Sequence, residues 1–320
     1  MLLILSVEGD TSTNHVIDWL IHYDVKFIRI NGEDKFSLYK FELSNNDFIC
    51  SLINCKTQEI IDLAAISSIW YRRGDINFFD KLNIVEDLFD IKKYMDDEYS
   101  VLHDFIIYYL ESKPKIDGFR TSVVNKLKVL KIAKEIGLSI PITLIFQGSF
   151  PDNIYGDYIT KSLSEVYRTE TIDNGYYYTP TTLIDPKSER LKGLCYSLSK
   201  LQNHIEKECD VRVFYIKGNF YSMAIMSQNN EKSTVDFRHY PSDPPNRSFP
   251  VKLPENVENM LDSLMVKLLL DSGSIDLILD KYGNFIFLEI NPVGQFGMTS
   301  LPCNYYLQKK IALKLSKLAI

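Results

Sequence analysis

The segment at residues 275–295, IDLILDKYGNFIFLEINPVGQ, restricts the fold of this chain more than any other stretch. An apolar run at residues 275–279 carries one acid, Asp276, and residues 285–290 form a second apolar run. The Tyr-Gly-Asn sequence at residues 282–284 separates the two runs and is typical of a turn. Two short apolar runs joined by a turn predict a β-hairpin with largely buried arms.

This hairpin would bring three oxygen-bearing side chains to one place. Glu289 and Asn291 lie on the same side of the second arm, because side chains alternate along a strand, and Asp276 lies on the first arm. Mg²⁺ prefers hard oxygen ligands and usually takes one or two carboxylates together with phosphate oxygens. A bound ion would also compensate for burying two carboxylates, which is otherwise unfavourable. We therefore expect a site for a Mg²⁺–nucleotide; the alternative is an ordinary hairpin with surface acids.

The same residues resemble a known signature. The Asp at 276, the Glu at 289 and the Asn at 291, within Leu-Glu-Ile-Asn-Pro, resemble the magnesium-binding end of the ATP-grasp ligases. The next residues, Pro-Val-Gly-Gln-Phe at 292–296, resemble the branch that matures ribosomally made peptides. That branch includes the microviridin- and plesiocin-type omega-ester graspetide ligases and, in particular, the grasp-with-SPASM maturases. Many of these carry Asn-Gly-Gln-Trp where this chain has Val293 and Phe296.

The composition narrows the class of protein. A chain of 320 residues is longer than the length that usually forms a single hydrophobic core, so we expect two or three subdomains. A net charge of −6 argues against a nucleic-acid partner, which would need a broad basic face. The five cysteines form no CxxC pair and no zinc spacing, which fits reduced thiols in the cytoplasm. The apolar start at residues 1–7 is too short to span a membrane, so we expect a cytoplasmic protein without a membrane partner.

The pattern of apolar runs and turns predicts a mixed chain with an α/β first part and an α+β remainder. Residues 1–115 are expected to form an N-terminal α/β domain. The resemblance makes residues 116–200 the central and residues 201–320 the C-terminal subdomain of an ATP-grasp fold. Besides the C-terminal hairpin, we expect strands at residues 2–7, 25–30, 48–54, 58–62, 67–71, 140–146, 158–161, 166–171, 176–183, 211–216 and 220–227. We expect helices at residues 14–23, 84–111, 125–137, 255–270 and 304–318.

Two lysines are candidates for binding phosphate. Lys126 lies in the first turn of its helix, where a cation opposes the helix dipole; it is either an exposed lysine or one directed at phosphate. Lys161 ends an apolar strand and either extends its ammonium group to solvent or pairs with a phosphate. The resemblance implies that both are the nucleotide lysines of ATP-grasp ligases.

The resemblance also implies where the base and the ribose would lie. Gln202, Asn203 and Ile205 occur where the family joins its two nucleotide-gripping sheets, so their backbone would pair with the adenine edge and Ile205 would pack on the ring. Asp210 matches the acid that accepts hydrogen bonds from the ribose hydroxyl groups. A glutamine and an aspartate at the start of a strand are common, so the pattern has little specificity alone.

Arginines and an acid are the candidates for assisting the chemistry. Arg212 alternates with valines on its strand, and Asp236 and Arg238 share a face at a spacing of two. The planar guanidinium binds phosphate or carboxylate with two hydrogen bonds and stays charged. By resemblance, Arg212 and Arg238 neutralise phosphate and the acyl-phosphate transition state; the alternative is surface ion pairing. Members similar to D-alanine ligase carry an arginine where this chain has Ser274, so in this chain the positive charge that faces phosphate must come from another residue.

Two further groups could contact a peptide. Arg72 and Arg73 stand in a Trp-Tyr-Arg-Arg sequence similar to one in the family, and they could bind a peptide carboxylate or face the acidic helix that follows. Tyr176 and Tyr178 lie in the hairpin around an Asp-Asn-Gly turn. Clustered aromatic side chains there could anchor a leader peptide or simply pack in the core.

These features together predict an ATP- and Mg²⁺-dependent carboxylate ligase. The resemblance implies that it phosphorylates Asp or Glu side chains of a ribosomal precursor peptide, leader plus core. Thr, Ser or Lys side chains would then close ester or amide rings. One alternative is an ATP-grasp ligase that adds a free amino acid such as glutamate to a protein or metabolite. Another is a nucleotide-binding regulator without turnover. The resemblance also implies a homodimer.

Overall fold

The computed structural model describes residues 1–78, 89–152, 154–164, 168–170, 176–191, 193–229, 235 and 245–319. The chain divides into two compact units, each considered by itself below. The first unit comprises Met1–Val123, Leu270–Ser272 and Pro292–Ile320, and the second comprises Val124–Leu269 and Gly273–Asn291. The end of the chain, expected in the C-terminal subdomain, therefore belongs to the first unit in this division.

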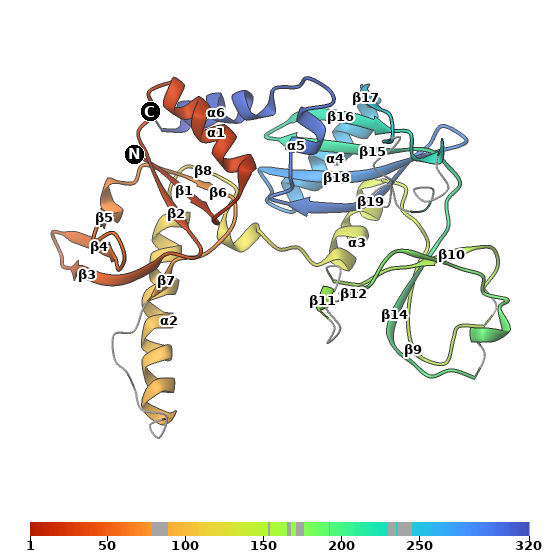
Figure 1. The fold of residues 1–320 in the computed structure, drawn as a ribbon, viewed down its shortest axis with the longest axis horizontal. Helices are drawn as coiled ribbons and strands as arrows, with labels where there is room; N and C mark the ends of the chain where they lie inside the picture. The colour runs from red at the N-terminus through yellow and green to blue at the C-terminus, as the bar shows by residue number, and fades with distance from the viewer. Residues whose placement is uncertain are drawn as a thin grey trace. The chain divides into compact units, whose positions relative to one another are not determined.

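A parallel sheet of order β2-β1-β6-β8 forms the centre of the first unit (Figure 1). Its strands are β1 (Leu2–Ser6), β2 (Phe27–Asn31), β6 (Ser68–Tyr71) and β8 (Lys115–Ile116). All of β1 is buried, as expected for an apolar strand that is covered on both faces of a parallel sheet. The strands expected at residues 2–7, 25–30 and 67–71 are thus confirmed.

Helices α1 (Thr11–His22) and α6 (Leu307–Leu318) pack against each other in the first unit, side by side in Figure 1. Helix α1 begins three residues before the expected position of 14 because the Asp10 side chain accepts a hydrogen bond from the Thr13 N–H and caps the helix. Short helix α5 (Gly297–Ser300) precedes α6.

A second sheet in the first unit has the order β5-β4-β3-β7. Its strands are β3 (Lys35–Leu43), β4 (Phe48–Asn54), β5 (Ile60–Asp62) and β7 (Asn77–Phe78). Helix α2 (Phe89–Glu111) contributes Ile106 and Leu110 to the core that Phe36 and Leu52 of this sheet share. The β4–β5 hairpin was expected, whereas the sequence had indicated no strand at the position of β3.

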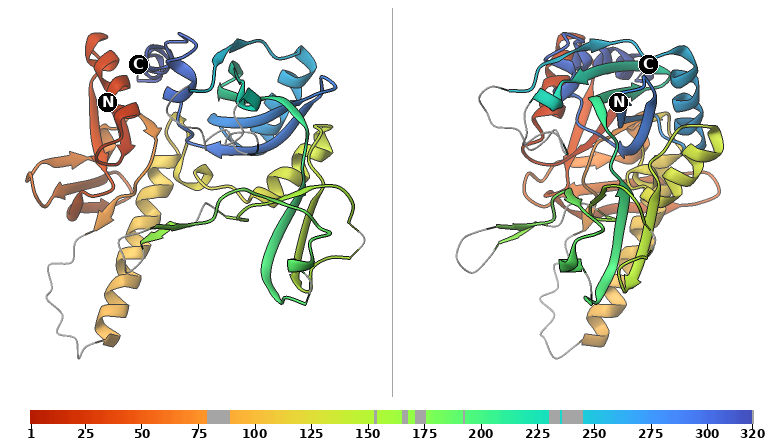
Figure 2. Two further views of the ribbon diagram at one scale, coloured as in Figure 1. Left: turned by 45° about the vertical axis from the view of Figure 1, so that its right-hand side comes forward. Right: turned by 90° about the vertical axis from the view of Figure 1, so that its right-hand side faces the viewer.

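The second unit contains an antiparallel sheet of order β13-β10-β14-β9. Its strands are β9 (Thr143–Gly148), β10 (Tyr158–Thr160), β13 (Thr182–Ile184) and β14 (Tyr196–Asn203), and β9 and β14 run as a long pair in Figure 2. A separate hairpin joins β11 (Arg168–Glu170) and β12 (Tyr176–Tyr178). Helix α3 (Lys126–Ile136) ends at Gly137, whose φ of 102° allows the left-handed cap that the sequence predicted.

A five-stranded sheet of order β17-β16-β15-β18-β19 completes the second unit. The strands are β15 (Lys207–Ile216), β16 (Asn219–Ile225), β17 (Ser248–Val251), β18 (Ser272–Asp280) and β19 (Phe285–Pro292), and α4 (Glu255–Lys267) packs against α3. Short 3₁₀ helices cover Leu63–Ala65, Phe119–Thr121, Glu189–Leu191 and Ser227–Asn229. Neighbouring strands β18 and β19 confirm the predicted C-terminal hairpin. In the part of the chain described above, no helix is both long and apolar enough to cross a membrane.

Candidate functional site

A pocket in the second unit is lined by residues from both of its sheets. The antiparallel sheet and its connections contribute Ile159, Lys161, Thr181, Gln202 and Asn203, and the five-stranded sheet contributes Asp210, Asp276, Ile278, Leu288 and Glu289. Ile205, on the connection between β14 and β15, also lines it. Most of the residues that the sequence predicted for nucleotide and metal therefore meet in one place.

Asp276 of β18 is held between two predicted site residues. The Arg212 Nη1 group donates to the Oδ1 and Oδ2 atoms of Asp276 at 2.5 and 2.6 Å, from the neighbouring strand β15. The Asn291 Nδ2 group of β19 donates to Asp276 Oδ2 at 3.4 Å. The hairpin thus brings Asp276 and Asn291 together as predicted, and Arg212 supplies the countercharge for a nearly buried carboxylate.

Glu289 of β19 lies between the two predicted phosphate lysines. Its Oε2 atom is 3.7 Å from Lys126 Nζ and 3.7 Å from Lys161 Nζ. Lys126 begins helix α3 and Lys161 follows β10, so this meeting depends on the packing of separate elements. Neither lysine extends into solvent, since each side chain is only 19% exposed.

Lys200 is a third cation in this cluster, at a position that the sequence analysis does not predict. It lies on β14, is 5% exposed, and donates from Nζ to the Ser162 carbonyl oxygen at 2.7 Å. Burial, followed by the neighbouring Lys161 and Lys126 ammonium groups, lowers the pKa of Lys200 to about 8, and Glu289 opposes that shift. The three ammonium groups outnumber the Glu289 carboxylate among them, an arrangement that suits a polyanion such as a phosphate chain.

Asp210, the predicted ribose ligand, already has charged and polar partners. Lys207 Nζ donates to its two carboxylate oxygens at 2.9 and 2.8 Å, and Ser227 Oγ donates to Oδ2 at 2.6 Å. Lys207 lines the same pocket and was also missed from the sequence. The contact between Asp210 and a ribose stays a prediction.

The residues predicted at the adenine edge line the pocket with one polar atom unsatisfied. Gln202 Nε2 donates to Thr143 Oγ1 at 2.9 Å, whereas Gln202 Oε1 is buried without a hydrogen-bond partner among the described residues. Asn203 uses its Oδ1 atom to accept from the Ile142 N–H at 2.6 Å. A buried polar atom without a partner is unusual in a native protein and fits a ligand that donates a hydrogen bond.

The acids suit a metal ion that arrives with a phosphate ligand. No group of three or more His, Cys, Asp or Glu side chains within the described residues could by itself hold a metal. Asp276, Glu289 and Asn291 offer two carboxylates and an amide, a partial oxygen set of the kind that Mg²⁺ accepts when phosphate oxygens and water complete it. The chemistry of these donors therefore fits Mg²⁺ together with a nucleotide.

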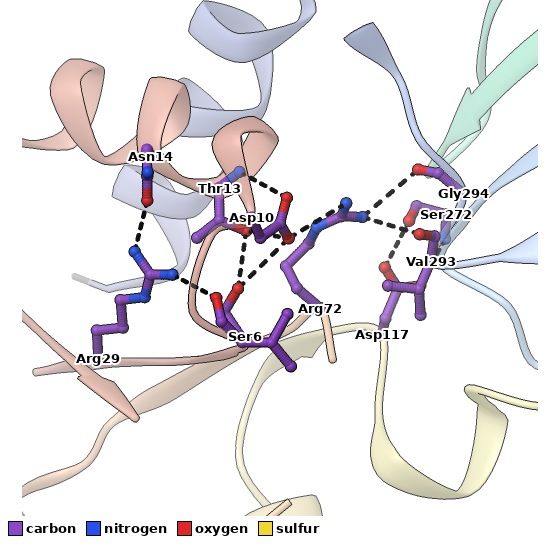
Figure 3. A network of polar contacts seen from close by, with 11 residues as sticks. Ser6, Asp10, Thr13, Asn14, Arg29, Arg72, Asp117, Ser272, Val293 and Gly294 are labelled. Carbon is purple, nitrogen blue, oxygen red and sulfur yellow. Dashed lines mark hydrogen bonds and ion pairs between the residues drawn. The ribbon is translucent and has the colours of Figure 1, made fainter. Parts of the chain in front are cut away.

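The predicted peptide-contacting residues lie in different settings. Arg72 is 2% exposed and donates a hydrogen bond to the Val293 carbonyl oxygen of its own unit, as Figure 3 shows. Arg73, in contrast, is exposed. The side chains of Tyr176 and Tyr178 lie outside the described residues, although their strand β12 pairs with β11. Asp236 and Arg238 also lie outside the described residues.

Structural comparison relates the chain to several ATP-grasp ligases. The structure of a RiPP-associated ATP-grasp ligase from Chryseobacterium gregarium, in complex with ADP and a leader and core peptide, matches with a TM-score of 0.76 and 22% identity over 99% of this chain and 96% of that chain. The macrocyclase MdnC from Microcystis aeruginosa MRC, bound to the precursor peptide MdnA, matches with a TM-score of 0.73 and 23% identity over 99% of this chain and 100% of that chain. The ATP-grasp ligase PsnB, complexed with a minimal precursor, Mg and ADP, matches with a TM-score of 0.70 and 14% identity over 100% and 97% of the two chains.

No protein-family model and no curated protein matches the sequence. At these levels of identity the structural likeness establishes the fold. The chain has the ATP-grasp fold, with mixed α/β sheets, over nearly its whole length, and the predicted fold class is confirmed.

Proposed function

We propose that this chain is an ATP-dependent ligase that activates Asp or Glu side chains of a ribosomal precursor peptide and closes macrocycles with Thr, Ser or Lys side chains. One observation carries the proposal. Lys126 and Lys161 each lie 3.7 Å from Glu289, and Lys200 interacts electrostatically with all three. Lys161 and Glu289 line one pocket together with Asp276. Cations for a phosphate chain and oxygen ligands for a divalent ion thus occur together, in a fold whose solved examples include complexes with ADP and Mg.

The nucleotide would lie between the two sheets of the second unit. Gln202, Asn203 and Ile205 would contact the base, and Asp210 would accept hydrogen bonds from the ribose. Asp276, Glu289 and Asn291 would hold Mg²⁺, which when bound supplies positive charge to the phosphate oxygens. Glu289 would change its contacts when the nucleotide binds, because Lys126 and Lys161, which now lie beside its carboxylate, would then face phosphate.

The reaction requires positioning and charge more than covalent chemistry by the protein. A substrate carboxylate oxygen attacks the γ-phosphorus of ATP, the bond to the β–γ bridging oxygen breaks, and ADP and an acyl-phosphate result. A peptide hydroxyl or amine then attacks the acyl carbon, loses its proton, and expels inorganic phosphate. Lys126, Lys161 and Lys200 would stabilise charge on the transferred phosphate, and Arg212 would orient Asp276. Asp236 and Arg238 would also assist this step; we propose their role from the sequence resemblance alone.

The choice of a peptide substrate is supported by the structural neighbours, several of which are complexes with precursor peptides. On this chain we propose that the leader binds the β11–β12 hairpin through Tyr176 and Tyr178, and that Arg73 contacts a peptide carboxylate. A homodimer and membership of the grasp-with-SPASM type are further parts of the proposal, and they depend on the sequence resemblance at Pro-Val-Gly-Gln-Phe.

Mass spectrometry tests the proposal directly. The protein is incubated with ATP, Mg²⁺ and a small peptide encoded beside its gene, and the Glu289→Gln variant serves as the control. The expected product has lost the mass of one water for each ring formed, and the variant yields none. A gain in mass would instead identify a ligase that adds amino acids, and an unchanged peptide in the presence of ATP hydrolysis would reject the peptide substrate.

A further inference from the structure

Arg72 carries a buried charge in the first unit and is not one of the residues that line the pocket described above. It follows strand β6 directly, its N–H donates to the Leu5 carbonyl oxygen of β1 at 2.8 Å, and its side chain is 2% exposed. A guanidinium group in such a place is unfavourable unless charges and hydrogen-bond acceptors surround it. Its contacts therefore indicate why the chain places an arginine here.

A fixed carboxylate lies beside the guanidinium group. Arg72 Nη2 is 3.9 Å from Asp10 Oδ2, and that carboxylate accepts from Thr13 Oγ1 at 2.8 Å and from Ser6 Oγ at 3.3 Å (Figure 3). Burial pushes the pKa of Asp10 upward, but Arg72 and the Thr13 hydrogen bonds outweigh burial, so the pKa lies below its ordinary value. Asp10 is therefore an ionised and oriented partner for Arg72.

The other side of the guanidinium group binds the segment after β19. Arg72 Nη1 donates to the carbonyl oxygens of Val293 at 3.2 Å and Gly294 at 3.5 Å. Its Cζ atom lies 5.7 Å from the centre of the Trp70 ring and 5.1 Å from that of Phe296, in the range of cation–π contacts. One side chain thus binds two successive carbonyl groups and contacts an aromatic ring two residues further on.

The bound segment has an unfavourable backbone conformation. Val293 has a φ of 54°, in the left-handed region that β-branched residues strongly avoid. Such a conformation persists only where the surroundings hold it in place. Burial of the Val293 side chain in the core of the first unit is one restraint, and the hydrogen bond from Arg72 to its carbonyl group is another.

We infer that Arg72 is a positioning residue: it holds the left-handed turn at Val293 and thereby fixes the backbone that leads out of the metal-ligand strand. Asn291, which donates to Asp276 at 3.4 Å, precedes Val293 by one proline. The ring of Pro292 fixes its φ, so little rotational freedom separates the turn from Asn291. The inference rests on the proposed function only in taking Asn291 as a metal ligand.

The test uses Mn²⁺ as a spectroscopic substitute for Mg²⁺, with ADP present, and measures its affinity by electron paramagnetic resonance. Arg72→Lys keeps the charge but loses the planar guanidinium group, whose Nη1 atom donates to both carbonyl oxygens while Nη2 faces Asp10. We expect it to weaken Mn²⁺ binding about tenfold, the effect of losing one hydrogen bond from a charged group. Affinity for ADP without metal should not change. Amide hydrogen exchange at residues 293–296 should become faster in the variant.

The double variant Arg72→Lys/Val293→Gly distinguishes positioning from general damage. Glycine adopts a positive φ without strain, so the second change should restore much of the lost Mn²⁺ affinity. Phe296→Leu, a milder change that removes one ring from the guanidinium group, should weaken Mn²⁺ binding in the same direction but less. This variant keeps the test valid if Arg72→Lys unfolds.

Two results would overturn the inference. One is a double variant that binds Mn²⁺ no better than Arg72→Lys. The other is normal Mn²⁺ binding by Arg72→Lys combined with weaker binding of the precursor peptide, which would make Arg72 a peptide ligand. Failure of the wild-type protein to bind Mn²⁺ and ADP would instead contradict the proposed function, and hydrogen exchange at residues 293–296 would still report on the turn.

Discussion

Lys200 and Ser162 are joined by a hydrogen bond of 2.7 Å from the Lys200 ammonium group to the Ser162 carbonyl oxygen, between β14 and the segment that leaves β10. In the same segment, Lys126 Nζ donates to the Ser164 carbonyl oxygen at 3.1 Å. Two lysines from distant parts of the sequence therefore bind carbonyl groups just after Lys161. This segment therefore contacts two of the lysines that we propose to bind phosphate.

Replacing Lys200 should weaken binding of nucleotide phosphates. We expect Lys200→Met to lower ATP affinity about tenfold, because a buried cation near the phosphate chain is lost. Lys200→Arg, which keeps the charge, should lose less. Isothermal titration calorimetry with ATP and with adenosine measures the effect, since adenosine lacks phosphate and should bind both variants equally. Equal losses for ATP and adenosine would show that Lys200 only supports the fold.

The affinity for ATP should depend on pH in a defined direction. Burial and then the neighbouring lysines lower the pKa of Lys200 from its ordinary 10.5 to about 8, so the ammonium group loses its proton as the pH rises through that value. A bound polyanion raises this pKa, so affinity is highest below pH 8 and falls as the pH increases above it. Lys200→Arg remains charged, so its affinity for ATP should change little as the pH rises above 8. An identical decline in wild type and Lys200→Arg would assign the titration to another group.

Glu289→Gln should remove the metal-dependent step. The variant keeps the shape of the side chain but loses the negative charge that Lys126 and Lys161 approach at 3.7 Å. We expect ATP turnover to fall about a hundredfold or more. Metal-free ADP should bind as well as before or better, because the two lysines lose a competing carboxylate. Steady-state hydrolysis and calorimetry measure the two effects, and full turnover in the variant would remove Glu289 from the metal site.

Arg212 and Asp276 should be coupled in stability. Arg212→Met leaves the Asp276 carboxylate nearly buried without its countercharge, and we expect a loss of about 3 kcal/mol in the free energy of unfolding. The double variant Arg212→Met/Asp276→Asn should recover most of this loss, because the uncompensated charge is gone. Urea unfolding of the two single variants and the double variant gives the coupling energy. Additive losses would mean that the close contact contributes little.

Gly74 should tolerate no side chain. Its φ is 78°, and a Cβ atom there would lie 2.4 Å from the Ser6 carbonyl oxygen. We expect Gly74→Ala to lower the free energy of unfolding by about 3 kcal/mol or more. Gly9 is the matched control, because its φ is 75° but nothing lies within 4 Å of an added Cβ atom. Gly9→Ala should cost only about 1–2 kcal/mol for its backbone conformation, and equal losses in the two variants would exclude a role for the Ser6 contact.

Features set by neighbouring residues could be predicted from the sequence. Helix α3 is an example, because the Asn125 side chain accepts hydrogen bonds from the Leu127 and Lys128 N–H groups and Gly137 ends the helix. The C-terminal hairpin is another, because its two apolar runs and its turn lie within one short segment. Strand β3 was missed because most of its side chains are exposed, so its apolar pattern is weak, and pairing with β4 defines it.

The composition of the site could be predicted only in part. The resemblance led to the residues that line the pocket, but Lys200 reaches the cluster through cross-strand register, in which Thr160 of β10 faces Leu201 of β14. No local pattern reports such a register. The burial of Arg72 could not be predicted from the sequence either, because its hydrogen-bond partners Val293 and Gly294 lie 221 and 222 residues away along the chain.

The return of residues 292–320 to the first unit has a consequence for biosynthesis. Helix α6 covers α1, and the side chain of Val293 joins the core of the same unit. A ribosome makes these residues after the whole of the second unit, so the first unit, although its synthesis starts before that of the second, lacks part of its core until residues 292–320 have been made. The second unit has all its residues by position 291. Of the two units, the one whose synthesis starts earlier is therefore the one that is completed later.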